Sequence, residues 1–281
     1  MSKPIIKWVG GKRQLLAELT GRLPTMQIKH YVEPFFGGGA LFFQIWEHLD
    51  SAHISDMNSE LVSLYSAVKN NPYDLISTLK NSIFTNDPEH FRMVRNWDHE
   101  PDYNKRPPEA RAARFIYLNK TGFNGLYRVN KSGKFNVPFG RHKNPKICDE
   151  DTILEAHKAF KHTQISTRSF HCVQFDFHEN DPANEDAFVY FDPPYVPMTA
   201  TANFTSYTTD GFNHQHQIEL KNVCDHLTKI GVKWMQSNSY TPVVLDLYKD
   251  YNIDEVQARR SVNSDAKGRG KVSEAIIRNY K

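Results

Sequence analysis

The chain has 281 residues, is 39% hydrophobic and 24% charged, and carries a formal net charge of +3, as expected for a soluble globular protein of one or two domains. No apolar run approaches the about 18 residues of a membrane-spanning helix, and residues 1–7 lack the apolar core of a signal peptide. The three cysteines lie too far apart for a metal site or a disulfide framework, which predicts free thiols in a reducing cytoplasm: Cys148, Cys172 and Cys224.

Short strand-like runs alternate with helical patterns along the chain. The strand-like runs are 31–35, 53–55, 173–175, 188–191, 232–237 and 275–280. Apolar residues at helical spacing cover 14–23, 40–49, 60–70, 110–118 and 215–230. This alternation predicts an α/β fold with a Rossmann-like, mostly parallel, doubly wound sheet.

The middle of the chain has a different pattern, because helical spacing dominates there without strand partners. We predict that 57–164 form an inserted helical domain, and that 1–56 and 165–281 together form the domain with the sheet. The stretch 105–146 contains eleven Lys and Arg residues and one acid, Glu109, so it carries +10 and leaves −7 for the remainder. This polarisation predicts a face that binds a polyanion, with a chance cluster of solvated charges as the alternative.

A glycine-rich segment follows the first predicted strand. In Glu33-Pro34-Phe35-Phe36-Gly37-Gly38-Gly39, the three glycines allow a ligand to approach the backbone closely. The segment matches neither a dinucleotide fingerprint nor a phosphate loop, which indicates a nucleoside without a pyrophosphate. Asp56 ends the next strand, where a carboxylate can accept both ribose hydroxyls. Trp8, in Lys7-Trp8-Val9-Gly10-Gly11-Lys12, can stack on an adenine or serve as a core anchor.

Asp192-Pro193-Pro194-Tyr195 follows the apolar run 187–191, which is typical of a buried parallel strand. The prolines remove two backbone donors, so the Asp192 and Pro193 carbonyls remain acceptors beside a carboxylate and a flat ring. That set suits the exocyclic amino group of a planar heterocycle. A strand that ends in a proline-rich surface turn is the alternative.

These motifs, in this order, resemble the DNA adenine methyltransferase (Dam) family, which uses S-adenosylmethionine. The resemblance rests on residues 7–12, 33–39, Asp56 and 192–195, and it covers essentially the whole chain. It extends to 119–128 and 136–141, which are similar to the hairpin of enzymes that read GATC, and to the loop 197–207. A double-stranded DNA substrate and a bacterial or phage-infected cytoplasm follow from the resemblance.

The resemblance implies roles for individual residues. The cofactor would be held by Trp8, Gly10, Lys12, Glu33, Phe36, Gly37, Gly39, Asp56, Asp176, Phe177 and Asp192. Catalysis would rest on Asp192, Pro193 and Tyr195. DNA would be contacted by Lys7, Phe123, Asn124, Leu126, Arg128, Pro138 and Arg141. We expect Asp176-Phe177 to end the strand before the catalytic one, although family members more often have Gly-Asp-Phe there.

The implied reaction is methyl transfer to the 6-amino group of an adenine that is flipped out of the duplex, with no metal. Tyr195 would stack on the base, and Phe204 or Tyr207 would form a second wall. The alternatives are an RNA adenine methyltransferase, an amino-cytosine enzyme, and a DNA-binding protein of this fold without activity. The hairpin favours duplex DNA, and an intact Asp192-Pro193-Pro194-Tyr195 favours catalysis.

Overall fold

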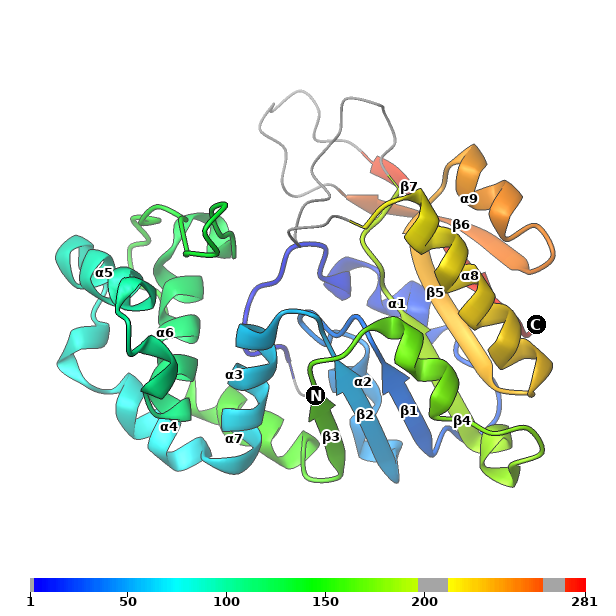
Figure 1. Cartoon of the computed structure of the whole chain (residues 1–281), viewed down its shortest axis with the longest axis horizontal. Helices are drawn as coiled ribbons and strands as arrows, with labels where there is room; N and C mark the ends of the chain where they lie inside the picture. Colours follow the sequence, from blue (N-terminus) through cyan, green and yellow to red (C-terminus); the bar gives the residue numbers. More distant parts are fainter. Residues whose placement is uncertain (1–2, 197–211, 260–270) are drawn as a thin grey trace. The chain divides into compact units, whose positions relative to one another are not determined.

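A computed structural model describes residues 3–196, 212–259 and 271–281 (Figure 1). The chain divides into two compact units. The first unit contains Met1–Gly11, Gly37–Trp46 and Asn58–Thr167, and the second contains Lys12–Phe36, Glu47–Met57 and Arg168–Lys281. The expected second-wall residues, Phe204 and Tyr207, and the loop 197–207 that contains them lie outside the described residues.

The second unit is built on a mostly parallel sheet. Its strands are β1 (His30–Glu33), β2 (Ser51–Ser55), β4 (Ala187–Phe191), β5 (Lys233–Ser239), β6 (Asn252–Arg259) and β7 (Lys271–Arg278). They lie in the order β2-β1-β4-β5-β7-β6; the first four are parallel, and β7 is antiparallel to both of its neighbours. The predicted α/β class with a Rossmann-like, mostly parallel sheet is confirmed.

The strand order reverses between β1 and β4, because the chain runs from β1 to β2 on one side and from β4 to β5 on the other. In open α/β sheets, ligands bind beyond the carboxyl ends of the strands at such a switch point. β1 ends at Glu33, and Asp192 follows the end of β4. Topology alone therefore directs attention to these two carboxyl groups.

The core of the second unit explains why β4 is apolar throughout. All five residues of β4 are buried, as expected for a strand with both faces covered. Helix α8 (His214–Lys229) packs along β5 with buried Leu220, Val223 and Leu227 facing the core (Figure 1). Among its described residues, this unit also contains α1 (Leu16–Thr20) and α9 (Pro242–Leu247).

The first unit is helical. It contains α2 (Phe42–Ile45), α3 (Ser59–Asn70), α4 (Pro72–Leu79), α5 (Pro88–Arg95), α6 (Pro108–Thr121), α7 (Glu150–Ala159) and the short strand β3 (Thr163–Ser166). Side chains cap two of these helices, since Asn58 accepts from amides at the start of α3 and Asp87 does so for α5. Helix α6 packs against α3, α4 and α5 and is the central helix of the unit.

The segment after α6 folds back on itself as predicted, but with little regular pairing. Isolated antiparallel bridges join Gly122 to Phe139 and Val129 to Phe135. The amide of Asn130 donates to the Lys134 carbonyl at 2.8 Å and closes the turn. We call residues 122–139 the hairpin.

Several expected elements differ from the structure. The expected strand at 173–175 is wrong, because Phe170–Phe175 form a 3-10 helix whose buried residues, Phe170 and Val173, are three apart. The helix expected at 14–23 is only Leu16–Thr20, and the one expected at 40–49 divides into α2 and a 3-10 turn, Trp46–His48. Sequence patterns also missed β3 and β6, which are too short or too polar for a clear signal.

Candidate active site and DNA-reading hairpin

The second unit brings three acidic residues to the carboxyl edge of its sheet. Glu33 ends β1, Asp56 follows β2, and Asp192 follows β4, and these three strands are parallel neighbours. The amide of Phe36 donates to the Ser55 carbonyl at 3.0 Å, which holds the chain after β1 against the end of β2. These predicted site residues therefore meet at one edge of the sheet.

Asp192 and Lys12 form a buried ion pair. The Lys12 ammonium lies 2.7 Å from Oδ1 of Asp192, and their side chains are only 8% and 18% exposed. Burial raises the pKa of Asp192 to about 6, although the neighbouring ammonium opposes the shift. Lys12 also lies 4.6 Å from the centre of the Tyr195 ring. The structure thus places Lys12, expected among cofactor residues, in direct contact with Asp192 and Tyr195.

The ring of Tyr195 is held by a residue that the sequence did not indicate. Its hydroxyl donates to Oε2 of Glu274, on β7, at 2.7 Å. Burial and the carboxylates of Asp192 and Glu274 raise the pKa of Tyr195 well above its ordinary value, so the hydroxyl keeps its proton and remains a donor. The ring is therefore fixed at both its polar end and its face.

Glu33, the acid at the end of β1, is buried and has a raised pKa. The Tyr31 hydroxyl donates to its Oε2 at 2.8 Å. Burial raises the pKa of Glu33 well above its usual range, and the negative charge of Asp192 adds to the shift. Glu33 therefore holds its proton to a higher pH than an exposed glutamate does.

The glycine-rich segment continues into the first unit. Gly37 and Gly39 have φ values of +48° and +66°, a conformation that favours glycine. A Cβ atom on Gly37 would lie 2.7 Å from Cδ1 of Trp8, so any side chain there would collide with the indole. The Tyr65 hydroxyl donates to the Gly37 carbonyl at 2.6 Å. The positive φ values at both positions and the close approach of Trp8 to Gly37 explain why glycine occurs there.

Trp8 lies in an aromatic stack within the first unit. Its ring centre is 6.2 Å from that of Phe115 and 5.7 Å from that of Tyr127. Trp8 thus packs as an anchor, and its stacking on an adenine stays a prediction. Gly10, with φ +77°, forms the turn that follows it.

Asp176 and Phe177 do not end a strand, contrary to expectation, because they follow the 3-10 helix Phe170–Phe175. The Asp176 carboxylate receives both terminal nitrogens of Arg168, a forked pair that fixes its orientation. Phe177 packs partly buried against the core of the second unit. Arg168 is a further residue that sequence reasoning missed.

Lys7 lies beside the base of the hairpin. Asn119, near the end of α6, accepts from the Lys7 amide at 2.9 Å and donates to the Lys7 carbonyl at 2.8 Å. The same buried side chain donates to the Gly125 carbonyl at 2.8 Å. One asparagine therefore joins two segments that the resemblance assigns to DNA contacts.

The predicted DNA-reading residues are mostly exposed. Phe123 is 49% exposed, and Asn124 has a φ of +55° that turns the chain at the hairpin base. Arg128 donates from Nε and Nη2 to the side chain and carbonyl of Asn136, at 2.7 and 3.1 Å, which aligns its guanidinium across the hairpin. The remaining members of the set are exposed or half-buried: Leu126, Pro138 and Arg141.

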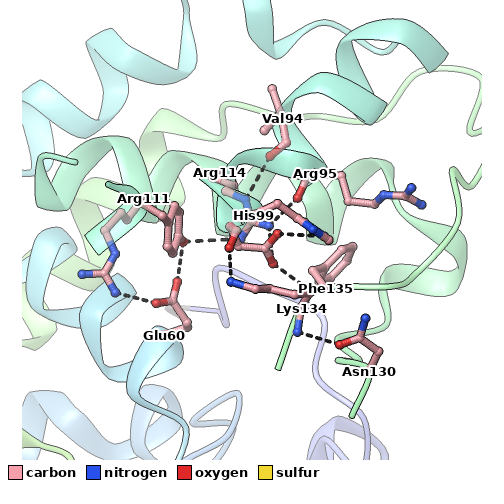
Figure 2. Close-up of polar contacts among 11 residues, drawn as sticks. Glu60, Val94, Arg95, His99, Arg111, Arg114, Asn130, Lys134 and Phe135 are labelled. Carbon is pink, nitrogen blue, oxygen red and sulfur yellow. Dashed lines mark hydrogen bonds and ion pairs between the residues drawn. The ribbon is translucent and has the colours of Figure 1, made fainter. Parts of the chain in front are cut away.

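A buried polar network attaches the hairpin to the helices (Figure 2). The Asp98 carboxylate accepts a hydrogen bond from the Phe135 amide at 2.8 Å and pairs with the Arg114 guanidinium at 2.9 Å. The Lys134 ammonium donates to the backbone carbonyl of Asp98. Arg114 also donates to the carbonyls of Val94 and Arg95 at 2.9 and 2.7 Å. Sequence patterns gave no signal for this network, because its members come from distant segments.

Ion pairs also reduce the positive charge that the basic stretch 105–146 can offer to a ligand. Five of its cations pair with carboxylates within the described part of the chain: Lys105, Arg106, Arg111, Arg114 and Lys146. Arg114 is only 4% exposed and cannot meet a ligand in solution. The charge available to a polyanion is therefore smaller than the count predicted and rests mainly on Lys120, Arg128, Lys131, Lys134, Arg141 and Lys143.

Within 3–196, 212–259 and 271–281, no three His, Cys, Asp or Glu side chains gather as metal ligands would. In the same ranges, no helix combines the length and the apolar character needed to cross a membrane.

Comparison with known proteins shows the family of this chain. A model of the D12 class N6 adenine-specific DNA methyltransferases matches residues 8–262. The type II methyltransferase M1.LlaDCHI of Lactococcus lactis subsp. cremoris is 41% identical over 279 residues, 99% of this chain and 95% of the relative. The type II methyltransferase M.MjaIII of Methanocaldococcus jannaschii is 40% identical over 99% of each chain. The DNA adenine methylase of Escherichia coli (strain K12) is 33% identical, over 98% of this chain and 94% of the relative.

The chain belongs to the D12 class of N6 adenine-specific DNA methyltransferases. The resemblance drawn from its motifs is confirmed, and its enzymatic class is an adenine-specific DNA methyltransferase.

Proposed function

We propose that this enzyme transfers the methyl group of S-adenosylmethionine to the 6-amino group of an adenine in duplex DNA, with GATC as its site. The observation that carries the proposal is the buried Asp192, paired with Lys12 at 2.7 Å and followed by a tyrosine ring that Glu274 orients. This arrangement offers fixed acceptors and a stacking surface at the switch point of the sheet.

Cofactor binding is assigned to the residues that the resemblance implies. Asp56 would accept the ribose hydroxyls, and the backbone at Gly37 and Gly39 would approach the nucleoside, with Trp8, Gly10, Glu33, Phe36, Asp176 and Phe177 completing the set. When bound, S-adenosylmethionine supplies an electrophilic methyl group. Asp176 would keep its Arg168 fork and use its remaining acceptor capacity.

Asp192 and the Pro193 carbonyl would accept the two amino hydrogens of adenine. These hydrogen bonds localise the nitrogen lone pair, which is otherwise delocalised into the ring, and so make the amine more nucleophilic. The carboxylate form is needed for this role, and Lys12 favours it against the cost of burial. Asp192 can then receive the proton that the amine loses after alkylation.

A base inside a duplex cannot reach these acceptors, so we propose that the adenine is flipped out. Tyr195 would stack on it, which is worth about 1–3 kcal/mol per base. The hairpin would read the site, with Lys7 and Arg128 on guanines and Phe123, Asn124, Leu126 and Pro138 at the bases. Arg141 and nearby lysines would bind phosphates, and residues 57–164 would thus form the DNA-recognition domain.

The biological setting follows from the relatives. Two of them are named type II methyltransferases, and another is named a DNA adenine methylase. We therefore place this enzyme in the cytoplasm, as the modifying partner of a restriction enzyme, with a solitary methylase as the alternative.

The test is transfer of labelled methyl groups to unmethylated duplexes that contain GATC or GATC with one base changed. Digestion then identifies the modified nucleoside. We expect 6-methyladenine only in the GATC duplex. Label on adenine in a changed duplex alone would keep the chemistry and overturn GATC, and label in RNA but in no DNA would overturn the DNA substrate.

A further inference from the structure

The end of strand β5 carries buried polar residues where a central strand ordinarily carries apolar ones. Gln236, Ser237, Asn238 and Ser239 are between 0% and 3% exposed. β5 lies between β4 and β7, so both of its edges are paired. Burying polar side chains costs free energy unless they form hydrogen bonds, and the partners of these side chains therefore indicate their purpose.

Two of these partners are backbone atoms of the turn that follows β4. The Ser239 hydroxyl donates to the Val196 carbonyl at 2.8 Å, and the Val196 amide donates to Oδ1 of Asn238 at 3.2 Å. Gln217, on α8 and 2% exposed, donates to the Pro194 carbonyl at 3.1 Å. Nδ2 of Asn238 donates to Oε1 of Gln217 at 3.1 Å and joins the two anchors.

We propose that Gln217, Asn238 and Ser239 form a polar bracket that positions residues 192–196 for methyl transfer, an inference that rests on the proposed function. The prolines fix φ at 193 and 194 but leave the torsions of Tyr195 and Val196 free. The bracket holds the backbone on both sides of Tyr195, at the Pro194 carbonyl and the Val196 amide. It is a set of positioning residues, acting on the catalytic turn through its backbone.

The energetic argument is one of alignment. A displacement of about 1 Å at a reacting group can lower a rate about 100-fold. Loss of one of several anchors should displace the turn less than that. We therefore expect loss of one bracket hydrogen bond to lower the methyl-transfer rate about tenfold. The affinities for S-adenosylmethionine and for DNA should stay unchanged.

Ser237 provides a matched control on the same strand. It lies two residues before Ser239 and so on the same face of β5, is equally buried, and shares a hydrogen bond of 2.7 Å with the Tyr190 hydroxyl. Its partner lies within β4, before the catalytic turn. Ser237→Ala therefore reproduces the loss of a buried hydroxyl without loss of the bracket.

The experiment compares Ser239→Ala with Ser237→Ala in the full-length enzyme. Single-turnover methyl transfer is measured at saturating S-adenosylmethionine and GATC duplex, together with both dissociation constants and the melting temperature. We expect Ser239→Ala to be about tenfold slower than wild type and Ser237→Ala to stay within twofold, with the dissociation constants of both within twofold and similar melting temperatures.

Equal transfer rates for the two serine variants would overturn the bracket, provided that the wild type transfers methyl groups. Absence of transfer by the wild type would instead overturn the proposed function. If Ser239→Ala does not fold, Gln217→Met carries the test, because methionine has a similar length and no donor for Pro194. A tenfold slower Gln217→Met supports the bracket, and a wild-type rate overturns it.

Discussion

The turn 192–196 and the hairpin 122–139 are held in place in different ways. Asp192 and Tyr195 follow a fully buried strand, and ion pairing and hydrogen bonding hold their side chains in place. The residues proposed to read DNA are mostly exposed on a segment with only two isolated bridges among its described residues, and buried anchors at Asn119 and Asp98 hold its base. Chemistry needs fixed atoms, whereas a reading surface needs exposed side chains on a secured base.

The largest expected effect is at the catalytic turn. Asp192→Ala removes the carboxylate acceptor and should lower methyl transfer at least about 10³-fold, which corresponds to about 4 kcal/mol of barrier. DNA affinity should stay within a few-fold, because the hairpin is untouched. Transfer assays and DNA titrations measure the two quantities, and wild-type-like turnover would remove Asp192 from the mechanism.

The buried network around Asp98, which anchors the hairpin, should contribute to the free energy of unfolding. Arg114→Met leaves the buried Asp98 carboxylate without its guanidinium and should lower the free energy of unfolding by about 3 kcal/mol. Arg92→Met is the control, because Arg92 is 66% exposed and its carboxylate partner is 3.9 Å away. Chemical denaturation gives both values. Equal losses would show that the network does not stabilise the first unit.

A smaller effect should distinguish recognition of the DNA sequence from methyl transfer. Arg128→Ala removes the guanidinium aligned by Asn136 and should cost about 1–3 kcal/mol of discrimination at one guanine. The substrates are GATC duplexes with each guanine replaced in turn, and Lys131→Ala serves as an exposed control of like charge. A uniform loss on all sequences would make Arg128 a phosphate contact.

The smallest effect concerns pH. Burial raises the pKa of Asp192 to about 6, so the reactive carboxylate is lost as pH falls through that value. We expect kcat/KM to be level above about pH 7 and to fall about tenfold per unit well below pH 6. Lys12→Met removes the charge that lowers this pKa, so the fall in kcat/KM should begin at a higher pH. If the fall begins at the same pH as in the wild type, the titration belongs to another group.

The same raised pKa has a consequence for stability with the opposite sign. The folded protein holds the Asp192 proton at a higher pH than the unfolded chain does. Asp192 therefore disfavours folding above about pH 6, and this penalty is relieved as pH falls from 6 toward the ordinary carboxyl value. Activity and the Asp192 contribution to stability should consequently change in opposite directions across that window.

Local patterns were sufficient for much of this protein. The apolar run 187–191 predicted β4, and Asp192-Pro193-Pro194-Tyr195 predicted a rigid set of acceptors. These features depend on neighbours along the chain, so the sequence determined them by itself. It did not separate the 3-10 helix Phe170–Phe175 from a strand, because short apolar runs fit both.

Tertiary structure alone decided which side chains meet. The pairing of Lys12 with Asp192 and that of Tyr195 with Glu274 join residues far apart in the chain, and burial made Arg114 a structural cation instead of a DNA contact. The polar end of β5 has no local signature of a role and acquires one only beside the catalytic turn. The physical reason is that hydrogen bonds, desolvation and pKa depend on distances in space, which local spacing does not encode.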